Sequence, residues 1–81
     1  MNLKPLAPNM TELQPNKSLK VLFSYQTPVA CQWTNGDVYE YFQTSKKWSK
    51  TTSRHINKWL NNNPAKFQDQ EYFDNLISEV K

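Results

Sequence analysis

The dipeptide Asn35-Gly36, flanked on both sides by alternating apolar and polar residues, constrains this chain more than any other feature. Both residues tolerate a positive φ, which a two-residue type I′ turn requires at its two central positions. We therefore predict a β-hairpin in which Thr34 pairs with Asp37. The core face of this hairpin should then carry Val29, Cys31, Trp33, Val38, Glu40 and Phe42.

The opposite face of the predicted hairpin carries Tyr39 and Tyr41. Tyrosine is common in strands for intrinsic reasons, so packing against the N-terminal segment is one interpretation. The alternative is a second interface, used either for a partner protein or for a homodimer.

The segment before the hairpin changes character near residue 18. Pro5, Pro8 and Pro15 precede that point, and proline removes a ladder donor and restricts the residue before it. We therefore predict a loose N-terminal arm over residues 1–17, with at most one short edge strand, and a single domain over residues 18–81.

A further strand, before the two strands of the hairpin, is predicted where apolar residues begin to alternate, from Leu19 to Tyr25. Pro28 interrupts this alternation before the hairpin begins. Proline inside such a pattern indicates either a turn or a bulge, and the sequence leaves both open.

A first helix is predicted from the cluster Thr51-Thr52-Ser53, because a hydroxyl there can accept a hydrogen bond from an unpaired amide of the first turn. The run Asn61-Asn62-Asn63-Pro64 should end this helix near Asn62. Ile56, Trp59 and Leu60 lie on one side of the helix and form the predicted buried stripe.

A second helix should begin near Gln68 or Asp69, and Asp69 is the better capping residue. Apolar residues recur at helical spacing after it, and Phe67 is expected to cover its entry. The fold class is therefore α+β, with a small antiparallel sheet packed against two C-terminal helices. The apolar face of the second helix consists of Phe73, Leu76, Ile77 and Val80.

The segment from residue 46 to 58 is basic, contains no acidic residue and has aromatic residues among its charges. A surface of this kind attracts phosphates or an acidic protein. We predict a binding site for nucleic acid or a protein partner here, although a net charge of +3 is equally compatible with a solvated face. The candidate residues are Lys46, Lys47, Trp48, Lys50, Arg54, His55, Lys58 and Asn61.

The composition argues against an enzyme and against a metal or cofactor site. The chain has one histidine and one cysteine, whereas a structural zinc site needs about four ligands. We expect Cys31 to be a small buried residue. His55 should either stack on Trp59 or contact a phosphate. A lone thiol and the lack of a signal peptide or a long apolar run favour a cytoplasmic protein without a membrane span.

Two segments, LFSYQTPVA from Leu22 to Ala30 and KKWSKTTSRHINKWL from Lys46 to Leu60, resemble a family of small uncharacterised proteins found in phages and prokaryotic genomes. The resemblance covers roughly residues 18 to 61 and implies a prokaryotic or phage-encoded setting. It implies no activity for any residue.

The resemblance and the small size leave a second functional hypothesis. Small phage proteins that block host factors, including anti-CRISPR proteins, are similar in size and also lack catalytic motifs. A protein-binding inhibitor or adaptor would use the tyrosine face, or the acidic second helix as a mimic of nucleic acid.

Overall fold

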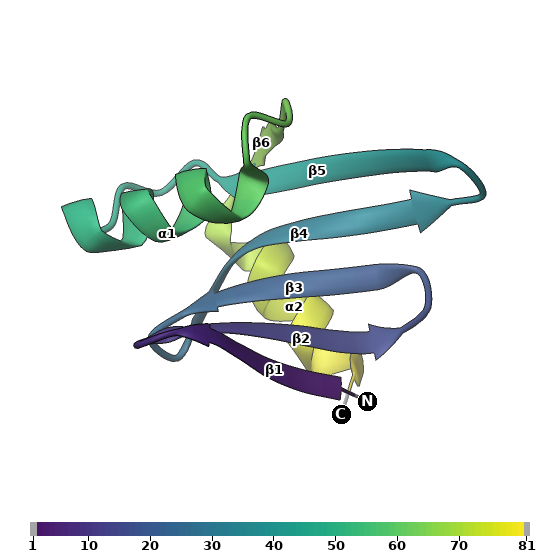
Figure 1. Cartoon of the computed structure of the whole chain (residues 1–81), viewed down its shortest axis with the longest axis horizontal. Coiled ribbons are helices and arrows are strands. Elements are labelled where there is room, and N and C mark those ends of the chain that lie inside the picture. Colours follow the sequence, from purple (N-terminus) through teal and green to yellow (C-terminus); the bar gives the residue numbers. More distant parts are fainter. Residues whose placement is uncertain (1, 81) are drawn as a thin grey trace.

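A computed structural model describes residues 2–80 and shows one sheet with a helix on each of its faces (Figure 1). The sheet has six strands in the order β1-β2-β3-β4-β5-β6. Helix α1 (Lys50–Leu60) lies between β5 and β6 in the chain, and α2 (Gln70–Val80) follows β6. The α+β class is as predicted. The strands are β1 (Asn2–Ala7), β2 (Met10–Asn16), β3 (Leu19–Ser24), β4 (Thr27–Asn35), β5 (Val38–Thr44) and β6 (Lys66–Gln68).

Both faces of the central strands contribute to the core, because successive side chains of a strand point to opposite sides and a helix packs on each side. On one side Leu22 of β3 packs with Ile56 and Leu60 of α1. On the other side its neighbour Val21 packs with Phe73 and Leu76 of α2. Our prediction of one core face was therefore incomplete, since α1 and α2 each cover a different face.

The predicted loose arm is wrong. Residues 2–16 form β1 and β2, and β1 to β5 run as an antiparallel meander. The three prolines occupy positions that a strand tolerates. Pro5 lies in β1 at the edge of the sheet, Pro8 lies in the turn that follows, and Pro15 lies where the pairing of β2 with β3 shifts register.

The hairpin between β4 and β5 is confirmed, but its register differs from our prediction. Asn35 pairs with Val38, so the two loop residues are Gly36 and Asp37. Gly36 has a φ of 63°, and a positive φ at the first loop residue is typical of a type II′ turn. Cys31 therefore pairs with Phe42 and not with Glu40.

Pro28 lies at a bulge. Leu22 pairs with Ala30 and the next residue, Phe23, pairs with Pro28, so one residue of β4 has no direct partner. The turn comes earlier, at Tyr25, which has a φ of 59°.

The helix caps refine the predicted boundaries. The hydroxyl of Ser49 accepts a hydrogen bond from the amide of Thr52 at 3.2 Å, so α1 is capped before the predicted Thr-Ser cluster. Asn61 ends it in the left-handed conformation with φ at 48°. The predicted cap Asp69 accepts a hydrogen bond from the amide of Tyr72 at 3.0 Å.

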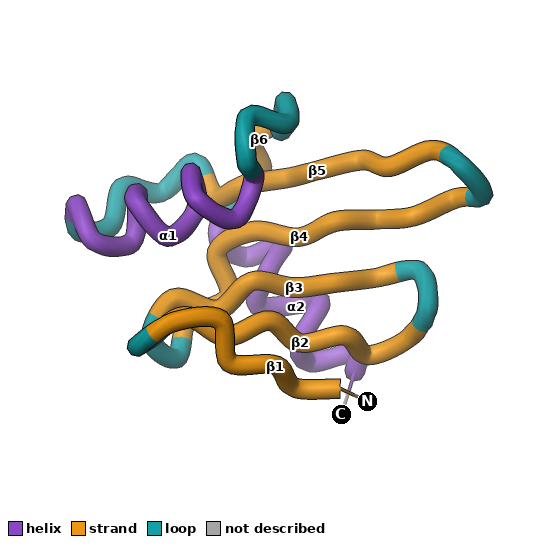
Figure 2. The backbone as a smooth tube through the Cα atoms, viewed as in Figure 1, coloured by secondary structure: helices purple, strands orange, loops and turns teal. Residues whose placement is uncertain are grey.

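The turns between the consecutive strands β1 to β5 lie at two opposite ends of the sheet (Figure 2). The connection from β5 to α1 lies at the same end as the β1–β2 and β3–β4 turns (Figure 2). Within the described residues, neither helix has the length and apolar character that a membrane span needs.

Candidate functional site

The connection between β5 and α1, residues 45–49, contains the first part of the basic segment and is fixed at both ends. The amide of Ser45 donates to the carbonyl of Gln68 at 2.8 Å, which ties it to the end of β6. The amide of Lys46 donates to the hydroxyl of Thr44 at 3.2 Å. Ser49 then caps α1. This connection therefore has a defined position relative to the sheet and α1.

Gln70, in the first turn of α2, orients the indole of Trp48. Its Oε1 accepts from the indole Nε1 of Trp48 at 3.2 Å and from the hydroxyl of Thr44 at 2.9 Å. Its Nε2 donates to the carbonyl of Pro28 at 2.7 Å. The amide of Gln70 thus joins α2, β4, β5 and the basic segment. Trp48 itself remains 38 % exposed.

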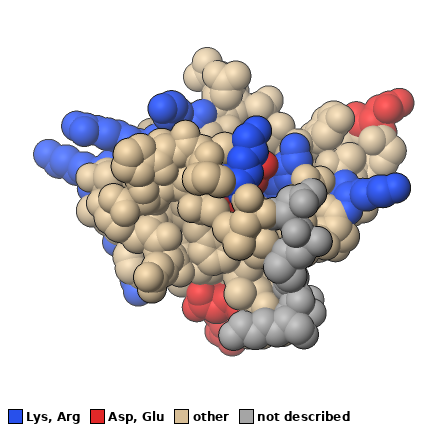
Figure 3. Space-filling model, turned by 60° about the horizontal axis from the view of Figure 1, so that its bottom comes forward, with Lys and Arg blue, Asp and Glu red and all other residues tan. Residues whose placement is uncertain are grey.

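The outer face of α1 carries the remaining cations. Lys50, Arg54 and Lys58 are all exposed, while the predicted stripe of Ile56 and Leu60 is buried and Trp59 is half-buried. Among the side chains that the structure describes, no acidic group lies within 4.0 Å of the cations of Arg54 or Lys58. In Figure 3 a group of Lys and Arg side chains projects from the left, the side on which α1 begins in Figure 1.

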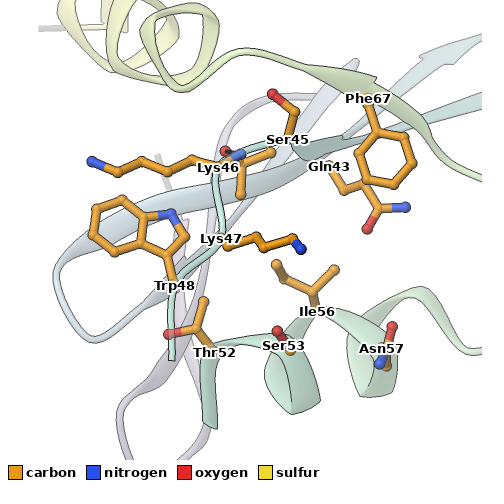
Figure 4. Close-up of a pocket in the computed structure, with 11 residues that line it drawn as sticks. Gln43, Ser45, Lys46, Lys47, Trp48, Thr52, Ser53, Ile56, Asn57 and Phe67 are labelled. Carbon is orange, nitrogen blue, oxygen red and sulfur yellow. Dashed lines mark hydrogen bonds between the residues drawn. The ribbon is translucent and has the colours of Figure 1, made fainter. Parts of the chain in front are cut away.

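A cleft of about 250 Å³ opens between this connection, the end of β5, β6 and α1. Figure 4 shows Lys47 extending into it between Gln43 of β5 and Ile56 of α1. Lys46 points away from Lys47, and its Nζ lies 4.3 Å from the centre of the Trp48 ring. The cleft therefore combines a cation, polar side chains and aromatic rings. We call it the basic cleft. Its lining includes Gln43, Lys47, Trp48, Ser53, Asn57 and Phe67.

Phe67 is the residue of the basic cleft that sequence reasoning placed wrongly. It does not cover the entry to α2, because it lies on β6 with 66 % of its surface exposed. In Figure 4 it lies at the opposite end of the cleft from Trp48. No periodic signal could have found it, because β6 has three residues and pairs in parallel with β5.

His55 lies outside the basic cleft and does not stack on Trp59 as one interpretation expected. Its Nδ1 lies 2.8 Å from the hydroxyl of Ser24, and its ring centre lies 6.1 Å from that of Tyr25. Ser24 also forms a hydrogen bond with Thr52 at 3.0 Å. Ser24 is 2 % exposed, so a substrate cannot reach its hydroxyl, and the pair ties α1 to the end of β3.

The two tyrosines of the predicted second interface have different environments. Tyr41 packs against Trp59 of α1 in a T-shaped arrangement, with ring centres 6.2 Å apart. Trp59 in turn donates to Glu12 at 3.0 Å. Tyr39 is 57 % exposed and is the member of the pair available for contacts.

The candidate residues thus fall into four places. Lys46, Lys47 and Trp48 line the basic cleft, and Lys50, Arg54 and Lys58 lie on the outer face of α1. Asn61 is the helix cap, and His55 faces the end of β3. Among the described residues no group of three or more histidine, cysteine or acidic side chains could hold a metal ion. The arrangement is suited to binding an anion together with a flat ring.

A family model described as a family of unknown function (DUF8033) matches residues 1–75. The chain belongs to the DUF8033 family. The family model spans β1 and β2 as well as most of the predicted domain, so it includes residues 1–17, which we predicted to be a separate arm. Comparisons with curated proteins and with solved structures gave no match.

Proposed function

We propose that this protein is a non-enzymatic nucleic-acid-binding module that contacts phosphates through the basic segment 46–58. The observation that carries the proposal is the set of cations in the basic cleft and on the outer face of α1. Lys47 enters the cleft, and Arg54 and Lys58 have no acidic partner among the described side chains. Cations that are free of internal ion pairs can bind phosphates at no cost to the fold.

Single-stranded nucleic acid fits the arrangement better than a duplex. Proteins that bind single strands combine a positively charged groove with aromatic side chains on which bases stack. Trp48 and Phe67 supply partly exposed rings beside Lys47. The proposal assumes the cytoplasm of a prokaryotic or phage-infected cell, where a lone thiol stays reduced.

The test is charge reversal with a matched control. Lys47→Glu, Arg54→Glu and Lys58→Glu together should abolish binding of a fluorescein-labelled single-stranded oligonucleotide, measured by anisotropy at low ionic strength. Circular dichroism should show an intact fold, because all three side chains are exposed. The control variant, Lys4→Glu with Lys17→Glu, reverses two exposed cations outside the basic segment and should have little effect on oligonucleotide binding. Absence of binding by the wild-type protein would remove the proposal.

A second candidate function is a phage-type protein-binding inhibitor or adaptor, and the free edge of β5 favours it. β6 pairs with residues 42 to 44 of β5, and no described strand pairs with this edge at Val38 and Tyr39, which are both more than half exposed. An extended peptide can add to such an edge. Affinity capture from a bacterial host with and without nuclease separates the two functions. A stoichiometric complex that survives nuclease and is lost in Tyr39→Ala would favour this one.

A further inference from the structure

The size of the basic cleft limits its ligand. Pockets for drug-sized molecules span about 300 to 1,000 Å³, and this cleft has about 250 Å³. It is therefore too small for a large cofactor and suits one planar ring system with its attached groups.

Two aromatic side chains border the cleft without being buried by the fold. Trp48 has its ring orientation fixed by the hydrogen bond to Gln70, so it loses little freedom when a ligand stacks on it. Phe67 is 66 % exposed although its backbone is held in the sheet. An exposed phenylalanine on a fixed strand contributes little to the core and is available to cover a ligand.

Two amide side chains in the cleft have no assigned hydrogen-bonding role. Gln43 and Asn57 both line the cleft, and none of the hydrogen bonds between described residues uses the side-chain amide of either. Each amide offers a donor and an acceptor side by side, the pattern that pairs with the edge of a nucleobase. The side chain of Lys47 extends from the connection toward these two amides, where it can neutralise a phosphate of the bound strand (Figure 4).

We infer that the basic cleft binds one unpaired nucleobase, which stacks on Trp48, while Phe67 and the amides of Gln43 and Asn57, at the other end of the cleft, contact the neighbouring nucleotide. This inference rests on the proposed function and gives it a substrate class, nucleic acid with unpaired bases. Lys46 covers one face of the indole at 4.3 Å. A base that stacks on that face displaces its ammonium, which then meets the adjoining phosphate; an exposed cation–π contact is weaker than base stacking.

The test compares two oligonucleotides of equal length, one with bases and one abasic throughout, so that their phosphate charge is the same. Wild-type protein should bind the base-bearing strand about tenfold more tightly for one stacked base. Trp48→Ala should remove this difference, and Trp48→Phe should keep most of it. Leu3→Ala, which removes an exposed apolar side chain of β1 outside the cleft, should leave it unchanged.

A second measurement uses only the wild-type protein, so it does not depend on whether a variant folds. The indole N–H signal of Trp48 in a nitrogen–proton correlation spectrum of the wild-type protein should shift with the base-bearing strand and stay in place with the abasic strand. Equal, salt-dependent binding of both strands would overturn the inference and leave the proposed function standing. Binding of neither strand would overturn both.

Discussion

The indole of Trp48 donates a hydrogen bond to the side-chain amide of Gln70, with 3.2 Å between Nε1 and Oε1. The two residues are far apart in the sequence, and their contact joins the basic segment to the start of α2. Since the same amide also bonds to Thr44 and to the carbonyl of Pro28, its position is determined by the sheet and not by the loop. Trp48 is thereby oriented before any ligand arrives.

Replacement of Gln70 should release Trp48. In Gln70→Leu the indole N–H, the Thr44 hydroxyl and the Pro28 carbonyl all lose a partner, which should lower the free energy of unfolding by about 1–3 kcal/mol. Binding of a base-bearing strand should weaken several-fold while binding of an abasic strand stays the same. Gln70→Glu is the comparison variant: it keeps both acceptor bonds, loses the donations to the Pro28 carbonyl and to Asp74, and should retain part of the base preference. Unchanged binding in Gln70→Leu would mean that Gln70 does not position the ring.

The helix cap distinguishes the structure from the sequence-based expectation. Ser49→Ala should destabilise the protein by about 1 kcal/mol, because the amide of Thr52 loses its acceptor, whereas Ser49→Gly should cost only a few tenths. Thr51→Ala should cost almost nothing, because Thr51 is exposed in the first turn and does not cap it. Urea denaturation measures all three variants. A larger loss in Thr51→Ala than in Ser49→Ala would show that the helix begins later.

Two phenylalanines should respond oppositely to removal of their rings. Phe73 on α2 is fully buried, so Phe73→Ala should cost about 3–5 kcal/mol. Phe67→Ala should change stability by less than about 0.5 kcal/mol, because its ring is mostly exposed, yet it should weaken binding of a base-bearing strand. Thermal unfolding and anisotropy titrations test the pair. Strong destabilisation by Phe67→Ala would assign that ring to the core.

Cys31 makes stability depend on pH in the alkaline range. Burial raises the pKa of its thiol from the ordinary value of 9.0 to about 12, and burial also raises the pKa of Tyr72. Between pH 9 and 12 the unfolded chain therefore binds fewer protons than the folded one, so stability is fully present below pH 9 and falls as the pH rises.

The variant Cys31→Val, which has a similar volume and no thiol, should lose part of this alkaline decline in urea titrations at rising pH. A thiol reagent at neutral pH should react with the wild-type protein only after unfolding. Rapid reaction of the native thiol, or an alkaline decline that Cys31→Val leaves unchanged, would contradict the assignment.

Local patterns predicted the elements that local interactions determine. The glycine turn, the amphipathic stripe of α1 and the cap Asp69 each depend on neighbouring residues, and each is present in the structure. The prolines misled the prediction of β1 and β2, because whether Pro5 is tolerated depends on its lying at the edge of a sheet. Edge position is a property of the complete sheet and is not encoded next to the proline.

The site was only half predictable for the same reason. Lys47 and Trp48 belong to a basic run that is visible in the sequence. Phe67, in contrast, reaches the cleft through the pairing of β6 with β5, and Gln70 reaches the Trp48 indole from the start of α2. The ring of Tyr41 likewise packs against Trp59 of α1, because α1 crosses the face of the sheet that our prediction left uncovered.

The salt dependence of single-strand binding tests the central claim most directly. If Lys47, Lys50, Arg54 and Lys58 contact phosphates, the logarithm of the binding constant should fall linearly with the logarithm of salt concentration, with a slope near −3, or about −0.7 per phosphate. Lys47→Gln should make the slope shallower by about 0.7, and Lys17→Gln should leave it unchanged. A slope near zero, or one that responds to Lys17 and not to Lys47, would contradict the account.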